Sequence, residues 1–126
     1  MARVRSKDST PELAVRRLLH SLGYRYRLHL NNLPGKPDIV LPKYDSVIFI
    51  HGCFWHHHKG CKKSKMPETN ADFWRKKILD NVARDKRNIR ELGEKDWKVL
   101  VLWECQVRSP KLQERINHFL EKKQIR

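Results

Sequence analysis

The chain has 126 residues, with 28 Lys and Arg against 14 Asp and Glu, and a formal net charge of +14 at pH 7. This length allows a single domain over residues 1–126. Neither an apolar run of roughly 18 residues nor an apolar segment after the basic N-terminus is present, which excludes a membrane helix and a signal peptide. We therefore expect a cytoplasmic protein. A strongly positive field attracts polyanions, so nucleic acid is the natural partner, and the alternative is a merely solubilising surface.

The apolar pattern predicts elements in the order α-β-β-β-α-β-α. In chain order they are a helix that starts around residues 9–11 and stops at Gly23, strands at 24–30, 38–41 and 47–50, a helix from Asn70 to near Gly93, a strand at 97–103 and a helix from Ser109. A polar loop of about twenty residues separates the third strand from the long helix, a length typical of functional loops. This order predicts an α/β domain with a mixed central sheet flanked by helices.

Asp38 lies at the open end of the expected hairpin. Pairing the two strands symmetrically about the turn at 42–45 places Leu41 near Val47 and Asp38 near Ile50, beside His51. A carboxylate, a main-chain carbonyl and an imidazole at one sheet edge could hold a divalent cation, and Mg²⁺ prefers oxygen ligands. In the alternative interpretation, Asp38 only caps the preceding turn.

Asp85 is a second carboxylate of interest because of its place on the long helix. One face of that helix, at about 100° per residue, is apolar and contains Trp74, Ile78, Val82, Ile89 and Leu92. Asp85 projects into the middle of this face, where an ionised carboxylate is costly unless it is paired or serves a metal or a histidine. It could instead pair with Arg84 or Arg87. Glu12, at the edge of the first helix's apolar face, is a weaker candidate.

The cysteines predict a structural zinc site. Cys53, His58 and Cys61 have metal-like spacing, while Cys105 is distant in sequence. The strands before Cys53 and Cys105 belong to a βαβ crossover, so they are parallel and end at one sheet edge, which makes the two cysteines neighbours. Three cysteines and a histidine form a closed tetrahedral site. The alternative is three free cysteines, and because residues 56–58 are all histidine, spacing alone does not choose the ligand.

Aromatic side chains stand among basic ones at two places. Phe54 and Trp55 lie in the His- and Lys-rich loop, and Trp74 precedes three consecutive basic residues. Such aromatics can stack on or between bases, and a mismatched pair is the cheapest to open. Alternatively, Phe54 and Trp55 cover the zinc loop, and Trp74 belongs to the apolar face of its helix.

Four motifs occur in order along the chain: LPGKPD at 33–38, VIFIHGCFWH at 47–56, FW at 73–74 and WEC at 103–105. Together they resemble the very short patch repair family of DNA mismatch endonucleases, over nearly the whole chain. The resemblance implies a relative of the type II restriction endonuclease core. It also implies a strand-specific nick at a T:G mismatch in double-stranded DNA, leaving 5′-phosphate and 3′-hydroxyl ends.

The resemblance further implies a role for each matched position. Asp38 and the main-chain carbonyl of Ile50 bind the catalytic Mg²⁺. The catalytic residues are Glu12, Asp38, His51, His56 and Asp85, with His56 activating water and His51 backed by Asp85. The structural zinc ligands are Cys53, His58, Cys61 and Cys105. The base-intercalating aromatics are Phe54, Trp55 and Trp74.

The sequence departs from the family pattern in three ways. Position 50 is Ile where threonine is common, and the interval from His58 to Cys61 has one extra residue. The basic N-terminal arm is short, and we expect this to weaken DNA binding and mismatch selection. We expect a monomer that works beside mismatch-repair proteins. The alternatives are a restriction- or homing-type nuclease with another target, a zinc-stabilised DNA-binding module without catalysis, and a basic structural protein.

Overall fold

The computed structural model describes residues 10–53, 58 and 68–124, the last three of these by their main chain alone. A four-stranded sheet runs in the order β1-β2-β3-β4. The strands are β1 (Arg27–Leu28), β2 (Ile39–Leu41), β3 (Ser46–His51) and β4 (Lys98–Trp103). β1, β2 and β3 pair antiparallel, and β3 and β4 pair parallel. The expected mixed sheet and its βαβ crossover are therefore confirmed.

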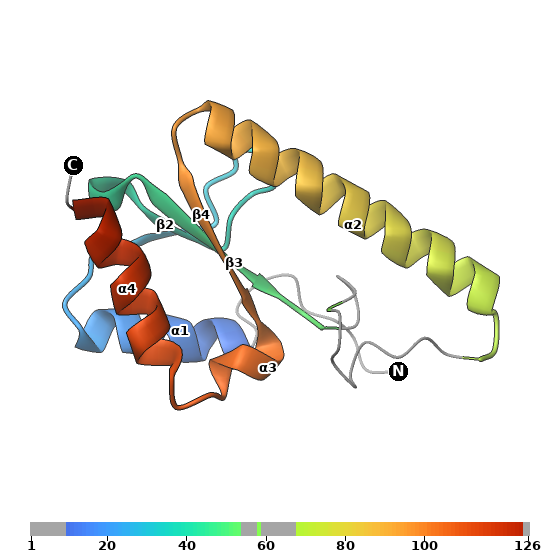
Figure 1. Cartoon of the computed structure of the whole chain (residues 1–126), viewed down its shortest axis with the longest axis horizontal. Helices are drawn as coiled ribbons and strands as arrows, with labels where there is room; N and C mark the ends of the chain where they lie inside the picture. Colours follow the sequence, from blue (N-terminus) through green and yellow to red (C-terminus); the bar gives the residue numbers. More distant parts are fainter. Residues whose placement is uncertain (1–9, 54–57, 59–67, 125–126) are drawn as a thin grey trace.

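Helices cover both faces of this sheet (Figure 1). They are α1 (Thr10–Ser21), α2 (Ala71–Glu94), the single turn α3 (Glu104–Val107) and α4 (Leu112–Gln124). In Figure 1, α1, α3 and α4 lie on one side, while α2 lies on the other and extends past the sheet. The predicted element order holds, with two differences: α3 was not expected, and the strand expected at 24–30 is reduced to β1.

The two faces of β2 and β3 pack into two separate clusters. Ile39, Leu41 and Ile48 are buried with residues of α1, α3 and α4, whereas Val40 and Val47 are buried with Leu92 of α2. Successive side chains of a strand point to opposite faces, so a strand covered on both sides is apolar throughout. Each fully buried aliphatic side chain contributes about 1.5–3 kcal/mol, so this double burial fixes the sheet between its helices.

The end of α1 follows the glycine signal. Gly23 has φ +86°, and the Tyr24 N–H donates to the Leu19 carbonyl at 3.0 Å. A glycine with positive φ commonly ends a helix in this way, because it carries no Cβ to clash. The predicted stop at Gly23 is confirmed, and the chain turns from there towards β1.

The register of the β2–β3 hairpin differs by one residue from the expected register. Leu41 pairs with Ser46, and Ile39 pairs with Ile48. A short 3-10 turn at Pro42–Tyr44 ends at Asp45 in the left-handed conformation, whose N–H donates to the Pro42 carbonyl. The turn ends at Asp45, so strand pairing begins at Ser46 rather than at Val47.

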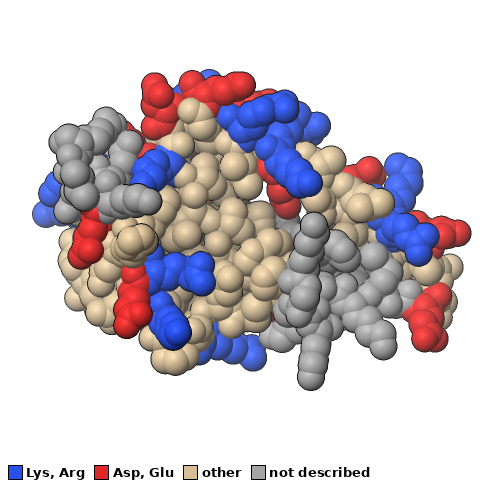
Figure 2. Space-filling model, viewed as in Figure 1, with Lys and Arg blue, Asp and Glu red and all other residues tan. Residues whose placement is uncertain are grey.

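Helix α2 buries only part of its expected apolar face. Ile78 and Leu92 are buried, whereas Trp74 and Asp85 are half-buried. Acidic and basic side chains both occur along α2 in Figure 2, so the charge on the visible surface of this helix is mixed. No helix among the residues that the structure describes is long and apolar enough to cross a membrane.

Candidate active site and metal centre

Glu12, His29 and Asp38 bring ligand atoms within 4.8 Å of one another, a group that could hold a metal ion. They come from three segments: the first turn of α1, the residue after β1 and the residue before β2. Sequence reasoning identified Asp38 and, more weakly, Glu12, but it missed His29.

Glu12 is almost completely buried, with 1% of its surface exposed. Its Oε2 lies 3.1 Å from Arg16 Nη1, one turn along α1, and 3.0 Å from His29 Nε2. An ionised carboxylate buried without partners costs on the order of several kcal/mol. The two contacts account for a carboxylate at this depth, and they make Glu12 far better placed than its helical position suggested.

Asp38 is tied to the neighbouring strand through its side chain. The Ile50 N–H donates to Asp38 Oδ2 at 2.7 Å. A short hydrogen bond to a carboxylate is among the stronger ones, so it fixes the Asp38 side chain at the start of the hairpin. Asp38 thus lies beside Ile50, as expected, although the strand register is shifted by one residue.

His29 leaves the alternation of its strand because its backbone has φ +51°. The strand pattern grouped it with Arg25 and Arg27 on the polar side, whereas the structure turns its ring to Glu12. Its N–H donates to the Asp38 carbonyl at 3.3 Å. One available signal was its position: pairing the strand at 24–30 with the next one puts His29 opposite Asp38.

His51 and Asp85 lie outside this group of close ligand atoms. His51, at the end of β3, has 6% of its surface exposed and packs edge-on against Trp103, with ring centroids 5.2 Å apart. Asp85 is half-buried on α2. Among the described residues, the group of Glu12, His29 and Asp38 therefore contains two of the predicted catalytic side chains, Glu12 and Asp38. His56 lies outside the described residues.

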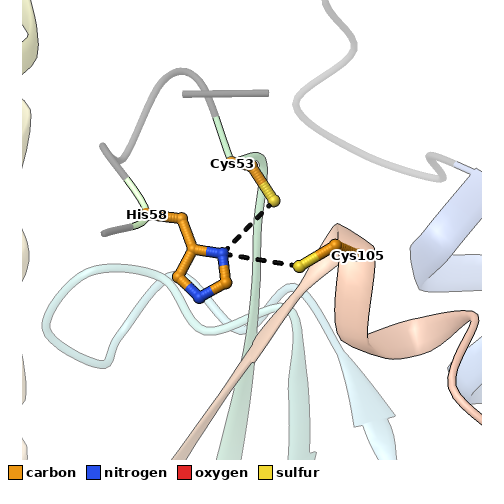
Figure 3. Close-up of side chains that lie close together, drawn as sticks. All are labelled: Cys53, His58 and Cys105. Carbon is orange, nitrogen blue, oxygen red and sulfur yellow. Dashed lines mark hydrogen bonds between the residues drawn. The ribbon is translucent and has the colours of Figure 1, made fainter. Parts of the chain in front are cut away.

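Cys53, His58 and Cys105 form a second group of converging ligand atoms (Figure 3). The Sγ atoms of Cys53 and Cys105 lie 3.6 Å and 3.4 Å from the same nitrogen, His58 Nδ1. The parallel pairing of β3 and β4, which ends with His51 opposite Trp103, brings the two cysteines together. Their expected proximity is confirmed; the fourth predicted ligand, Cys61, lies outside the described residues.

The spacing of these donors fits a tetrahedral metal. Zinc bonds of about 2.3 Å to sulfur and 2.0–2.1 Å to nitrogen, at a tetrahedral angle, separate the two atoms by about 3.5 Å. The observed separations of 3.6 Å and 3.4 Å lie on either side of this value. Two thiols and an imidazole are also the donor types that zinc prefers.

Neighbouring groups hold these donors in place. The Cys53 N–H donates to Glu104 Oε1 at 3.1 Å, and the His58 N–H donates to the Cys53 carbonyl at 2.9 Å. The ring of Trp103 stacks on His58, with centroids 4.3 Å apart and planes inclined by 7°. Trp103 therefore contacts both His58 of the Cys–His group and His51 on β3.

Of the three aromatics proposed to contact bases, the structure describes one. Trp74, in the first turn of α2, is half-buried and meets Phe73 edge-on at a centroid distance of 5.2 Å. Phe73 itself is 59% exposed. Phe54 and Trp55 lie outside the described residues, so their place relative to the Cys–His group stays a prediction.

Comparisons with known proteins agree on one family. Residues 1–63 match the family model described as DNA mismatch endonuclease Vsr. The chain is 51% identical over 107 residues to the Type II nicking enzyme V.XorIIP of Xanthomonas oryzae pv. oryzae, covering 85% of this chain and 78% of that protein. It is 44% identical over 109 residues to the DNA mismatch endonuclease Vsr of Escherichia coli, covering 86% and 69%.

A solved structure is similar in fold. The catalytic domain of the homing endonuclease I-Bth0305I superposes with a TM-score of 0.66 at 23% sequence identity, covering 92% of this chain and 98% of that domain. At this identity the likeness concerns the fold alone, and it supports the expected nuclease-like core.

Proposed function

The chain belongs to the family of Vsr DNA mismatch endonucleases, and from this premise we propose that it nicks the thymine-containing strand of duplex DNA at a T:G mismatch. It is a DNA nicking endonuclease of very short patch repair. The observation that carries the proposed chemistry is the meeting of Glu12 and Asp38, two carboxylates from distant parts of the chain, in one group of ligand atoms.

The oxygen donors of this group suit a hard cation. We assign Mg²⁺ to Asp38 and to the main-chain carbonyl of Ile50, with Glu12 beside them, because Mg²⁺ favours one or two carboxylates and leaves places for water and phosphate oxygens. When bound, the ion supplies stabilisation of the charge that develops on the scissile phosphate. The hydrogen bond from the Ile50 N–H to Asp38 Oδ2 keeps this carboxylate in place before any ion binds.

Imidazole side chains activate and orient the attacking water. A water oxygen attacks phosphorus while His56 accepts its proton, and the bond from phosphorus to the 3′ oxygen breaks. The leaving 3′ oxygen takes up a proton from a water molecule, and His56 returns its proton to solvent, which gives 3′-hydroxyl and 5′-phosphate ends. His51 assists in orientation and is backed by Asp85; its tight packing against Trp103 supports a fixed rather than a mobile ring.

The Cys–His group has a structural role in this proposal. Cys53, His58, Cys61 and Cys105 bind Zn²⁺ in a closed site, supported by the donor separations of the three described ligands. Such a site joins the end of β3 to α3 and leaves no coordination place for substrate.

DNA binding rests on charge and on aromatic side chains. The net charge of +14 favours association with phosphates. Phe54, Trp55 and Trp74 are proposed to enter the base stack at the mismatch, and the half-buried position of Trp74 beside an exposed Phe73 leaves it near the surface. We further propose that the protein acts as a monomer together with mismatch-repair proteins.

The test is cleavage of a labelled duplex with one T:G mismatch beside its matched T:A control. Mg²⁺-dependent nicking of the thymine strand in the mismatched duplex alone, lost in EDTA, is the expected result. Equal cleavage of both duplexes would overturn the mismatch assignment in favour of a nuclease with another target. Binding without cleavage, by an enzyme that contains zinc, would refute the catalytic assignment.

A further inference from the structure

His29 has an unusual backbone for a residue that directly follows a strand. It follows β1 with φ +51°, and its N–H donates to the Asp38 carbonyl at 3.3 Å. Positive φ is uncommon for residues other than glycine and persists only where the surroundings impose it. Here the conformation joins two contacts: the main chain of His29 bonds to Asp38, and its ring lies against Glu12.

The ring of His29 meets a carboxylate that has almost no access to water. Nε2 lies 3.0 Å from Glu12 Oε2, and the exposed fractions of the two side chains are 18% and 2%. At this depth the surrounding water screens little, so the contact has a large influence on where the carboxylate rests.

The two nitrogen-bearing side chains beside Glu12 come from different elements. Arg16 lies one turn along the same helix and contacts the same oxygen, Oε2, at 3.1 Å. His29 lies instead directly after β1 and is bonded through its main chain to Asp38. Arg16 can move with α1, whereas His29 relates the Glu12 carboxylate to the strand that bears Asp38.

We propose that His29 is a positioning residue that holds the Glu12 carboxylate beside Asp38 in the cation site; this inference rests on the proposed function. His29 touches neither substrate nor reacting atoms, and it acts by fixing the separation of two oxygen donors. Direct ligation by His29 is the competing role. Mg²⁺ favours oxygen over imidazole nitrogen, and Nε2 is already within contact distance of Glu12, so positioning is preferred.

Two substitutions separate the ring contact from the backbone. In His29→Asn the new residue tolerates positive φ, but its side chain is too short to reach the Glu12 carboxylate. His29→Gln carries an amide nitrogen at a reach similar to that of Nε2. His20→Asn, at an exposed position in the last turn of α1, is the matched control.

Turnover of the T:G duplex gives the first readout. His29→Asn should lower kcat by about 10–100-fold, as loss of a residue that orients a metal ligand typically does. The KM for DNA should stay within about twofold, because no DNA contact is removed. His29→Gln should recover most of the loss, and His20→Asn should match the wild type. Wild-type kcat in His29→Asn, or no recovery in His29→Gln, would overturn the proposal.

Binding of Mg²⁺ alone to the full chain, measured by calorimetry, gives a readout that does not need turnover. His29→Asn should weaken binding about as much as Glu12→Gln, and the double variant should be no weaker than either, since residues acting through one another are not additive. Additive losses would indicate that His29 binds the ion itself and would overturn the positioning role. If the wild type binds Mg²⁺ but does not nick the mismatch, the proposed function fails while this cycle still decides the role of His29. A wild type that binds no Mg²⁺ overturns both.

Discussion

The molecule carries two groups of converging ligand atoms, and they differ in how the fold assembles them. Cys53 and Cys105 follow two parallel strands that end at the same edge, so the topology itself makes them neighbours. Glu12 comes from a helix, while His29 and Asp38 flank two antiparallel strands, and the three meet only because particular side chains turn towards one another. The first group is a consequence of strand order, whereas the second depends on side-chain detail.

The groups also differ in what holds them. Around the Cys–His group the supports are a ring stacked on His58 and an N–H bonded to Glu104. Around Glu12, His29 and Asp38 the supports are polar contacts: Arg16 and His29 against Glu12, and the main-chain N–H of Ile50 against Asp38. From this contrast we expect substitutions in the Cys–His group to lower the stability of the fold, and substitutions in the group of Glu12, His29 and Asp38 to lower the rate of nicking.

Asp38→Asn should produce the largest effect and test the chemical half of this contrast. The substitution keeps the size of the side chain but removes the charge that we propose holds the cation, so nicking of the T:G duplex should fall by at least about 1000-fold. The melting temperature and zinc content should remain near those of the wild type. Turnover within tenfold of the wild type would remove Asp38 from the site.

Cys105→Ser tests the structural half. Loss of this proposed zinc ligand should lower zinc content and unfolding free energy together, and a loss of about 3 kcal/mol corresponds to a drop of about 10 °C in melting temperature. Elemental analysis and thermal unfolding measure both quantities on one sample. A full complement of zinc in the variant would contradict the ligand assignment.

Trp103→Leu tests whether the Cys–His group and the proposed catalytic residue His51 depend on the same support. Trp103 stacks on His58 and meets His51 edge-on. Each aromatic contact is worth about 0.5–1.5 kcal/mol, so zinc loss to a chelator should become several-fold to tenfold faster, and kcat should decrease by a similar factor. A change in zinc release with unchanged kcat would mean that His51 needs no support from this ring. Trp97→Leu, in the other core cluster, is the control.

Glu104→Gln weakens a single support of the Cys–His group. The amide oxygen can still accept the Cys53 N–H, but without the charge, so the loss should be about 1 kcal/mol. Zinc affinity should therefore decrease by about fivefold, with nicking at saturating zinc unchanged. Competition with a zinc-binding dye measures the affinity, and a value equal to that of the wild type would show that the bond from Cys53 is dispensable.

Tyr24→Phe gives the baseline for a contact outside both groups. The Tyr24 hydroxyl donates to Asn117 Oδ1 at 2.8 Å, and its removal should cost about 1 kcal/mol without changing zinc content or turnover. Burial, assisted by Tyr44 and Glu121, raises the pKa of Tyr24 above its ordinary value of 10.0. Folding therefore favours the protonated hydroxyl, and this contribution is complete below pH 10.0 and lost as the pH rises through the raised pKa.

Urea unfolding of the wild type and Tyr24→Phe at a series of pH values checks this sign. The difference in unfolding free energy should be constant at neutral pH and should shrink in strongly alkaline solution. A difference that grows above the ordinary pKa of tyrosine would contradict the assigned direction.

Much of the fold could be predicted because the signals were local. The helix stop at Gly23, the hairpin turn at 42–45 and the buried strands on either side of it depend on backbone preferences and apolar runs within a few residues. The single turn α3 was missed because it is too short to show a helical period; the Trp103 N–H donates to Gln106 Oε1 and starts it. The hairpin register was missed by one residue because strand pairing begins at Ser46, directly after the left-handed Asp45, and not at Val47.

The sequence by itself determined the order of the elements and the meeting of Cys53 with Cys105, and it singled out Asp38 as a candidate site residue. Each of these follows from periodicity, from turn residues or from the rule that crossover strands run parallel. Only the tertiary structure decided that Glu12 is buried, that His29 lies against it and that Asp38 is tied to Ile50. The reason is physical: a left-handed residue at position 29 reverses the side to which a strand side chain points, and a charge can be buried on a helix edge only when partners from another element come to meet it.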